Sequence, residues 1–249
     1  MTRISATSES YVSDGYEEAG DSAFRSRMRS PPSKRLPCFL SGSKSHIEDH
    51  ACIMKKTVGL SKELDEISAA IAACQRCKLA KTRTKVVPGE GSHRAEVMFI
   101  GEAPGREEDL QGRPFVGRAG KLLDRLLSEI GIGRRKVFIG NVLKCRPVSP
   151  EGKDRRPTEE EVSACSRFLD SQIERIKPRV ICTLGYTATH YILRKYRIEP
   201  DGISRIHGRV FEADKLKIIP LYHPAAALYA YRLERVMRKD FEKLKSILD

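Results

Sequence analysis

Short apolar runs alternate with amphipathic segments along most of this chain of 249 residues. Each run has the length of a buried strand, and each amphipathic segment repeats its apolar residues at helical spacing. The strand-like runs are residues 95–100, 137–139, 179–184 and 217–221, and residues 210–211 are a candidate short edge strand. Because crossover helices join parallel strands, this alternation predicts an α/β domain. We expect a three-layer α/β/α fold around a central, mostly parallel four-stranded sheet.

Local signals support the helical segments. Thr158 and Glu161 have the spacing of a capping box, so a helix is expected from there to about residue 176, ahead of Pro178. The other helices are expected at residues 61–73, 119–130, from 185 to about 193, and 231–248.

The positive charge of the chain is unevenly distributed. The whole chain has 46 Lys and Arg residues against 33 Asp and Glu, a net charge of +13, yet residues 1–53 contain seven of each sign. Residues 1–53 are also rich in Ser, Gly and Pro, which predicts a disordered extension ahead of a folded domain at 54–249. Met54 is a candidate translation start, and a genuine tail is the alternative. The excess charge is typical either of a nucleic-acid-binding surface or of a solvated lysine-rich one.

Two classes of protein are disfavoured by hydropathy. No stretch approaches 18 consecutive apolar residues, and the first 20 residues lack the apolar core of a secretory signal. We therefore expect an intracellular protein, cytoplasmic or nucleoid-associated, that is not secreted and does not bind a membrane.

Polar residues stand where the predicted strands end. In an open parallel sheet, ligands bind outside the carboxyl ends of the strands. The segments there are residues 101–105, 140–141, 185–186 and 222–224. We therefore expect Glu102, Asn141 and His223 to converge on one rim, although each alone also suits a turn or a helix cap.

Four of the seven cysteines are candidate metal ligands: Cys74, Cys77, Cys145 and Cys165. The first two form a CxxC motif, which by itself fits a redox, zinc or iron–sulfur site. Four thiolates can hold zinc or a [4Fe–4S] cluster, and four unrelated buried cysteines are the remaining alternative. The 19 residues between Cys145 and Cys165 argue against a zinc ribbon, which uses two close pairs.

Three segments together resemble a known family. They are GEAPGREEDLQGRPFVGRAGKLLD at 101–124, NVLKCRP at 141–147 and YHPAA at 222–226. With the four cysteines they are similar to the family 4 uracil-DNA glycosylases, the iron–sulfur branch of that superfamily. The resemblance covers roughly residues 60–248. It implies hydrolysis of the N-glycosidic bond of uracil in DNA, which releases uracil and leaves an abasic site. It also implies a structural [4Fe–4S] cluster on the four cysteines, with zinc as the alternative.

The resemblance assigns roles in binding the base. Uracil must be flipped out of the duplex into a pocket. Phe115 resembles the family's aromatic platform, and Asn141 resembles the residue that reads the base edge, since an amide complements uracil N3–H and O4. Gly101 and Ala103 belong to the same substrate-binding motif. His223 resembles the histidine that donates to uracil O2 and so stabilises the charge on the leaving base.

The residue that positions the attacking water is less clear from the motif. In the best-known branch of the superfamily an aspartate occupies the position of Ala103, and alanine has no equivalent chemistry. Glu102 is the first candidate, Glu108 and Asp109 are the second, and backbone groups of residues 101–105 are another.

The resemblance also suggests where DNA binds. Arg113, Arg118 and Arg232 are candidate phosphate contacts, and Leu228 is the candidate to fill the gap left by the flipped base. A monomer acting on single- or double-stranded DNA is expected. One branch of the superfamily traps uracil covalently through a histidine in a basic loop. The loop after Cys145 has no histidine here, so turnover is expected.

Two other interpretations also account for the positive charge and the four cysteines. One is a non-catalytic nucleic-acid-binding protein with a metal-stapled fold, which would not need Asn141 and His223 as a pair. The other is a glycosylase for a different deaminated base, such as hypoxanthine.

Overall fold

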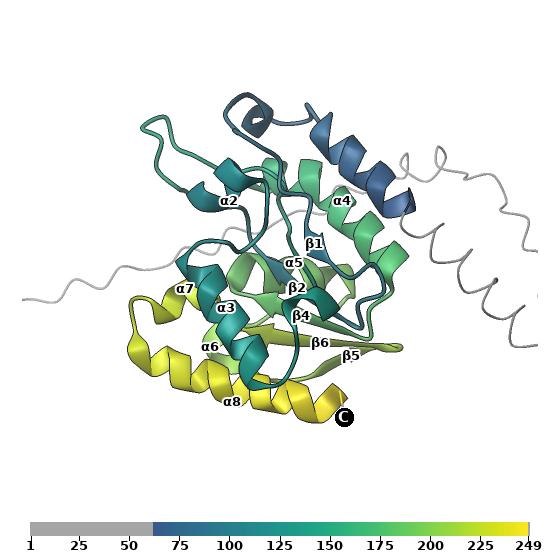
Figure 1. The fold of residues 1–249 in the computed structure, drawn as a ribbon, viewed down its shortest axis with the longest axis vertical. Helices are drawn as coiled ribbons and strands as arrows, with labels where there is room; N and C mark the ends of the chain where they lie inside the picture. The colour runs from purple at the N-terminus through teal and green to yellow at the C-terminus, as the bar shows by residue number, and fades with distance from the viewer. Residues whose placement is uncertain (1–61, 249) are drawn as a thin grey trace, which may run out of the picture. The chain divides into compact units, whose positions relative to one another are not determined.

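Six strands form one sheet in the order β1-β3-β2-β4-β6-β5 (Figure 1). They belong to a computed structural model that describes residues 62–248, so the expected extension at 1–53 and the candidate start Met54 lie outside the described residues. The strands are β1 (Glu90–Gly91), β2 (Val97–Gly101), β3 (Phe138–Asn141), β4 (Val180–Leu184), β5 (Phe211–Ala213) and β6 (Leu216–Leu221).

The four central strands, β3, β2, β4 and β6, pair in parallel, whereas β1 and β5 pair antiparallel at the two edges. The mostly parallel sheet is therefore confirmed, but the expected number of four strands is wrong. The two additional strands are short edge strands. β1 contains only a glutamate and a glycine, so it has no apolar pattern by which a sequence could reveal it.

The helices include those that the sequence patterns indicated and three short ones, of four to six residues, that they did not indicate, because so short a segment shows no apolar period. They are α2 (Arg106–Gln111), α3 (Arg118–Glu129), α4 (Glu159–Ile176), α5 (Tyr186–Lys195), α6 (Ile203–Ile206), α7 (Pro224–Ala227) and α8 (Tyr231–Leu248). Residues 62–72 are also helical, and short 3-10 turns cover Lys78–Lys81 and Arg134–Lys136. The capping box at the start of α4 is confirmed, because Thr158 accepts from the Glu161 N–H while the Glu161 carboxylate accepts from the Thr158 N–H.

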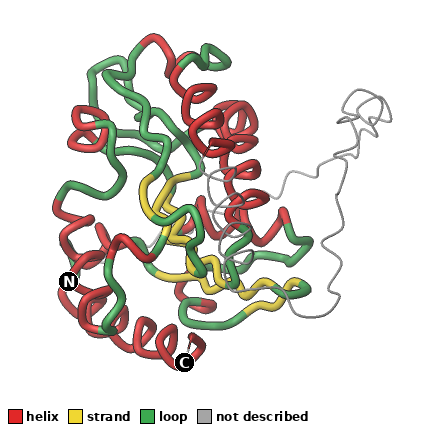
Figure 2. The backbone as a smooth tube through the Cα atoms, turned by 45° about the vertical axis from the view of Figure 1, so that its right-hand side comes forward, coloured by secondary structure: helices red, strands yellow, loops and turns green. Residues whose placement is uncertain are grey.

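Successive residues of β2 enter different cores, as the twofold repeat of a strand requires. Met98 and Ile100 pack with α4, α5 and α6, whereas Val97 and Phe99 pack with α3, α7 and α8. Helices therefore cover both faces of the sheet, which confirms the three-layer arrangement (Figure 2). Among the described helices, none is both long enough and apolar enough to cross a membrane.

Packing of α8 on the sheet gives a first test of this arrangement. The rings of Phe99 and Phe241 stack with centroids 5.7 Å apart, and both side chains are buried. We expect Phe241→Ala to lower the free energy of unfolding by about 3–5 kcal/mol, since it removes a ring from a closed core. Glu242→Ala, at the exposed next position, is the matched control. Denaturant unfolding measures both, and equal midpoints would contradict the packing described.

Candidate active site

The in-register parallel strands bring their carboxyl ends to one edge of the sheet. Gly101 at the end of β2 lies beside Asn141 at the end of β3, and Leu184 of β4 lies beside Leu221 of β6. His223 follows β6 by two residues. The structure thus shows Glu102, Asn141 and His223 together on one rim, as the sequence predicted.

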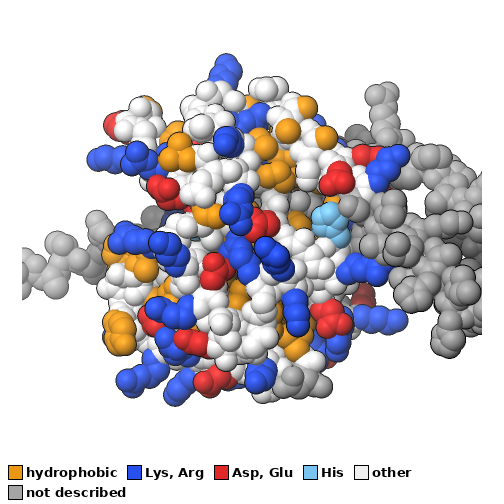
Figure 3. All heavy atoms as spheres, in the orientation of Figure 1, with side chains coloured by type: hydrophobic (Ala, Val, Ile, Leu, Met, Phe, Trp, Pro, Cys, Tyr) orange, Lys and Arg blue, Asp and Glu red, His pale blue; other side chains and the backbone are white. Residues whose placement is uncertain are grey.

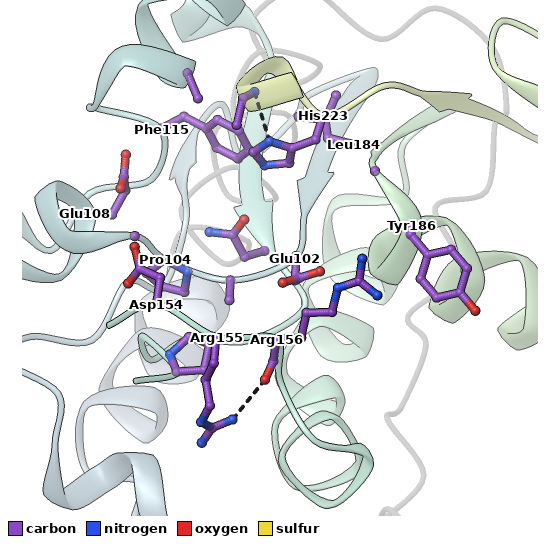
Figure 4. Close-up of a pocket in the computed structure, with 17 residues that line it drawn as sticks. Glu102, Pro104, Glu108, Phe115, Asp154, Arg155, Arg156, Leu184, Tyr186 and His223 are labelled. Atoms are coloured by element: carbon purple, nitrogen blue, oxygen red, sulfur yellow. Dashed lines mark hydrogen bonds between the residues drawn. The ribbon is translucent and has the colours of Figure 1, made fainter. Parts of the chain in front are cut away.

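A pocket of about 400 Å³ opens at this edge (Figure 4). Its walls include Glu102, Ala103, Phe115, Asn141 and His223, which come from four separate segments of the chain. The sequence motifs that are far apart along the chain therefore line a single cavity.

Asn141 lies in the wall of the pocket with an unused hydrogen-bond acceptor. Its side chain is 1% exposed, and its Oδ1 has no hydrogen-bond partner among the described residues. A buried polar atom without a partner is unfavourable, so it indicates a ligand group that completes it. Gly101 makes room for this amide, because a Cβ at Gly101 would lie 2.4 Å from Asn141 Oδ1 and 2.7 Å from Phe115 Cζ.

Phe115 is held in an unusual backbone conformation. Its φ is +49°, in the left-handed region that non-glycine residues rarely adopt. Glu108 fixes the loop, since its Oε1 accepts from the N–H groups of Val116 at 2.8 Å and Gly117 at 2.9 Å. The ring of Phe115 faces the pocket, with its centroid 5.6 Å from that of His223. Backbone strain of this kind, when tied down by neighbours, is typical of functional sites.

The tautomer of His223 follows from one hydrogen bond. The N–H of Ala225 donates to His223 Nδ1 at 3.1 Å, so this nitrogen is an acceptor and the ring proton is on Nε2. Burial lowers the pKa of His223 to about 4, opposed by the Glu108 carboxylate. The imidazole is therefore neutral at physiological pH, with an N–H available to donate.

The three acidic residues of the 101–124 motif that could position water have different surroundings. Glu102 lines the pocket and accepts a hydrogen bond from the Thr187 hydroxyl. Asp109 is buried outside the pocket, where both carboxylate oxygens accept from the Thr84 N–H at 3.0 and 3.1 Å. Glu108 lines the pocket but is engaged with the Phe115 loop. Of the three expected candidates for positioning water, Glu102 is therefore the one that lines the pocket without being bonded to the Phe115 loop.

Lys144 supports the candidate active site, a role that the sequence did not indicate. Its side chain is fully buried, and its Nζ donates to the Asn141 carbonyl at 2.9 Å and to Gln172 Oε1 at 2.8 Å. Gln172 in turn donates to the Pro88 carbonyl at 2.8 Å. Burial lowers the pKa of Lys144 to about 8. This network braces the backbone of Asn141 against α4. The only sign of this role in the sequence is that a single lysine stands among apolar residues directly after β3.

The four candidate ligand cysteines, Cys74, Cys77, Cys145 and Cys165, line a second cavity. Two sulfurs accept N–H bonds there: the Lys144 backbone donates to Cys165 Sγ at 3.2 Å, and Arg83 donates to Cys145 Sγ at 3.4 Å. Cys182 is buried elsewhere, in the core under α8. Among residues 62–248, no three Cys, His, Asp or Glu side chains are grouped closely enough to hold one metal ion.

The candidate DNA contacts differ in their availability. Arg113 forms an ion pair with Glu90 at 2.6 Å, so its guanidinium is engaged. Arg118 and Arg232 are exposed, and the Leu228 side chain is 40% exposed. On the face drawn in Figure 3, Lys and Arg side chains are spread widely and interspersed with acidic ones, so this face has no single basic patch.

Comparison with known proteins agrees with the geometry of the site. Residues 88–245 match the Uracil DNA glycosylase superfamily. The type-4 uracil-DNA glycosylase of Saccharolobus solfataricus is 47% identical over 190 residues, which cover 74% of this chain and 86% of that protein. The Archaeoglobus fulgidus relative of the same name is 48% identical over 187 residues, covering 74% and 92%. The Thermotoga maritima relative is 44% identical over 191 residues, covering 75% and 96%. This chain belongs to the Uracil DNA glycosylase superfamily and, within it, to the type-4 family.

The lowered pKa of His223 predicts how stability depends on pH. The unfolded histidine titrates near pH 6.5 and the folded one near 4, so the unfolded state binds more protons between these values. We expect the free energy of unfolding to fall by about 3 kcal/mol from this group as the pH drops from 7 to 4. Denaturant titrations across this range should show a shallower decline for His223→Gln. Parallel curves for the variant and the natural protein would contradict a neutral buried His223.

Proposed function

We propose that this protein hydrolyses the N-glycosidic bond of uracil in DNA, releasing free uracil and leaving an abasic site. The observation that carries the proposal is the combination, in one pocket, of an unpartnered amide oxygen on Asn141, a neutral N–H donor on His223 and the Phe115 ring in the pocket wall. The relatives' shared name supports the same reaction.

The pocket groups match the edges and face of uracil. The Asn141 amide can accept from N3–H and donate to O4, whereas cytosine presents the opposite pattern and would leave buried groups unpaired. Phe115 offers its ring for stacking on the flipped base. Because the Lys144 network and Gly101 fix Asn141, the amide is positioned before the base enters.

His223 and Glu102 have complementary roles in this proposal. Negative charge develops on uracil as the bond to the sugar breaks, and the His223 Nε2–H donates to O2, where that charge increases. A neutral imidazole stabilises this charge by a hydrogen bond and keeps its own proton, so the proton that uracil finally gains is the one that the attacking water loses. Glu102, hydrogen-bonded to Thr187, positions the water that attacks the sugar carbon and faces the positive charge that forms there.

Cys74, Cys77, Cys145 and Cys165 are the proposed ligands of a structural [4Fe–4S] cluster. The fit is supported by their common cavity and by the N–H donors directed at two of the sulfurs. Such a cluster stabilises the surrounding loops, since hydrolysis includes no redox step.

The remaining assignments are proposals of the same kind. Arg118 and Arg232 contact DNA phosphates, Leu228 fills the gap left by the flipped base, and Arg113 acts mainly through its pair with Glu90. The protein acts inside the cell, where its DNA substrate is, as a monomer whose folded domain spans 54–249.

The direct test is release of uracil. We expect the protein to convert a uracil-containing oligonucleotide into one that alkali cleaves at the uracil position, with free base detected by chromatography. Absence of cleavage above background by a folded protein would leave a non-catalytic nucleic-acid-binding role, and cleavage only at hypoxanthine would assign a different base.

Gly101→Ala tests the pocket without altering a reacting group. Its Cβ would displace Asn141 Oδ1 and Phe115 Cζ, so we expect kcat/KM for uracil release to fall by about 10²-fold or more. Gly133→Ala is the matched control, since a Cβ there meets nothing within 4 Å. Equal activity of the two variants would count against the proposed placement of Asn141 and Phe115.

Removing one cluster ligand tests the second cavity. We expect Cys77→Ala to lose iron and the broad visible absorbance of a cluster, and to unfold at lower temperature than the natural protein. Cys182→Ala should keep both iron and colour, because Cys182 lies in the core away from this cavity. A colourless natural protein with one zinc per chain would favour zinc instead.

A further inference from the structure

The rim of the pocket includes an arginine and a tyrosine that have no role in the proposed reaction. Arg156 is exposed and lines the pocket, and Tyr186, the first residue of α5, lines it with its side chain 52% exposed. Figure 4 shows the Arg156 side chain extending toward the space between Glu102 and Tyr186. No described residue forms a hydrogen bond or ion pair with the Arg156 guanidinium.

The side chain of the neighbouring residue, Arg155, is engaged in hydrogen bonds, in contrast to that of Arg156. Arg155 Nε donates to the Val148 carbonyl at 3.0 Å, and its two Nη atoms donate to Glu161 at 2.8 and 2.6 Å. Arg155 Nη1 also donates to the carbonyl of Arg156 at 3.0 Å. Arg155 therefore fixes the loop and the backbone of Arg156, and the Arg156 side chain extends from a held position with its donors unused.

Tyr186 is held in a similar way. Its ring lies 3.8 Å from the ring of His190, centroid to centroid, with a tilt of 31°. This contact orients one face of the tyrosine while much of the side chain stays exposed at the pocket rim. A fixed, exposed aromatic ring beside a free arginine is the combination that holds single-stranded nucleic acid, by stacking on a base and by binding the backbone.

On the basis of the proposed glycosylase function, we propose that Arg156 and Tyr186 form a subsite for the nucleotide next to the flipped uridine. The guanidinium binds an oxygen of the phosphodiester that joins the two nucleotides, and the Tyr186 ring stacks on the neighbouring base. The position follows from the pocket, because uracil between Phe115, Asn141 and His223 places its sugar and flanking phosphates at the rim. The subsite would let the enzyme hold a single strand without a complementary strand.

The test pairs protein variants with modified substrates. The substrates are single-stranded oligonucleotides with one uracil, flanked by natural phosphodiesters or by an uncharged methylphosphonate on its 5′ or 3′ side. The variants are Arg156→Gln, Tyr186→Ala and Tyr186→Phe. Lys215→Gln is the charge-matched control, because Lys215 is exposed in the turn before β6, at the opposite end of that strand from His223. Thermal unfolding confirms that each variant is folded.

We expect Arg156→Gln to raise KM about tenfold on the natural substrate, as the loss of a charge-assisted hydrogen bond does. One of the two methylphosphonates should raise KM of the natural protein by a similar factor and have no further effect on Arg156→Gln. The slope of log KM against log salt should become shallower by about 0.7 in this variant. Tyr186→Ala should raise KM about tenfold and Tyr186→Phe should not, since the phenylalanine keeps the ring.

The results distinguish failure of the subsite proposal from failure of the proposed glycosylase function. If the natural protein releases no uracil, the function itself is wrong. If it releases uracil and Arg156→Gln behaves as Lys215→Gln does, the subsite is wrong. A fall in kcat with unchanged KM and salt slope would mean that Arg156 acts on Glu102 instead, which also overturns the subsite.

Discussion

The parallel register of the four central strands is the constraint on which the site depends. Because β2 and β3 end side by side, the glycine that ends one strand lies against the amide that ends the other. The pairing of β4 with β6 brings the segment that contains His223 to the same edge. A shift of one residue in either pairing would turn these side chains to the opposite face of the sheet and disperse the pocket.

Among the described residues, nearly all buried polar side chains are paired; the two atoms without a partner are Asn141 Oδ1 and His190 Nε2, and the first is informative. Lys144, Gln172 and Asp109 each form hydrogen bonds within the protein. Asn141 Oδ1 does not, although it is equally buried. The surrounding pairs fix the backbone that carries the amide. Because the site is already ordered, little of the binding energy of a base is needed to order it, and the remainder favours the matching base over others.

The positions of the longer helices and of the central strands could be read from the sequence because they depend on local patterns. The apolar period and the capping box at Thr158 are properties of neighbouring residues. β1 could not be read in this way, since two residues have no period and its pairing is with a segment almost 50 residues away. Glu108 illustrates the same limit at the site. An acidic residue in a polar loop gives no sign that its carboxylate accepts from two backbone N–H groups eight and nine residues further on.

By itself, the sequence determined the layer architecture, the identity of the residues at the strand ends and the resemblance that gave them roles. These follow from residue type and spacing, which folding does not change. Only the tertiary structure decided the neutral Nε2–H form of His223, the unpartnered oxygen of Asn141, the buried bracing by Lys144 and the difference between Arg155 and Arg156. Burial and hydrogen-bond partners set each of these, and both depend on which distant segments meet at the edge of the sheet.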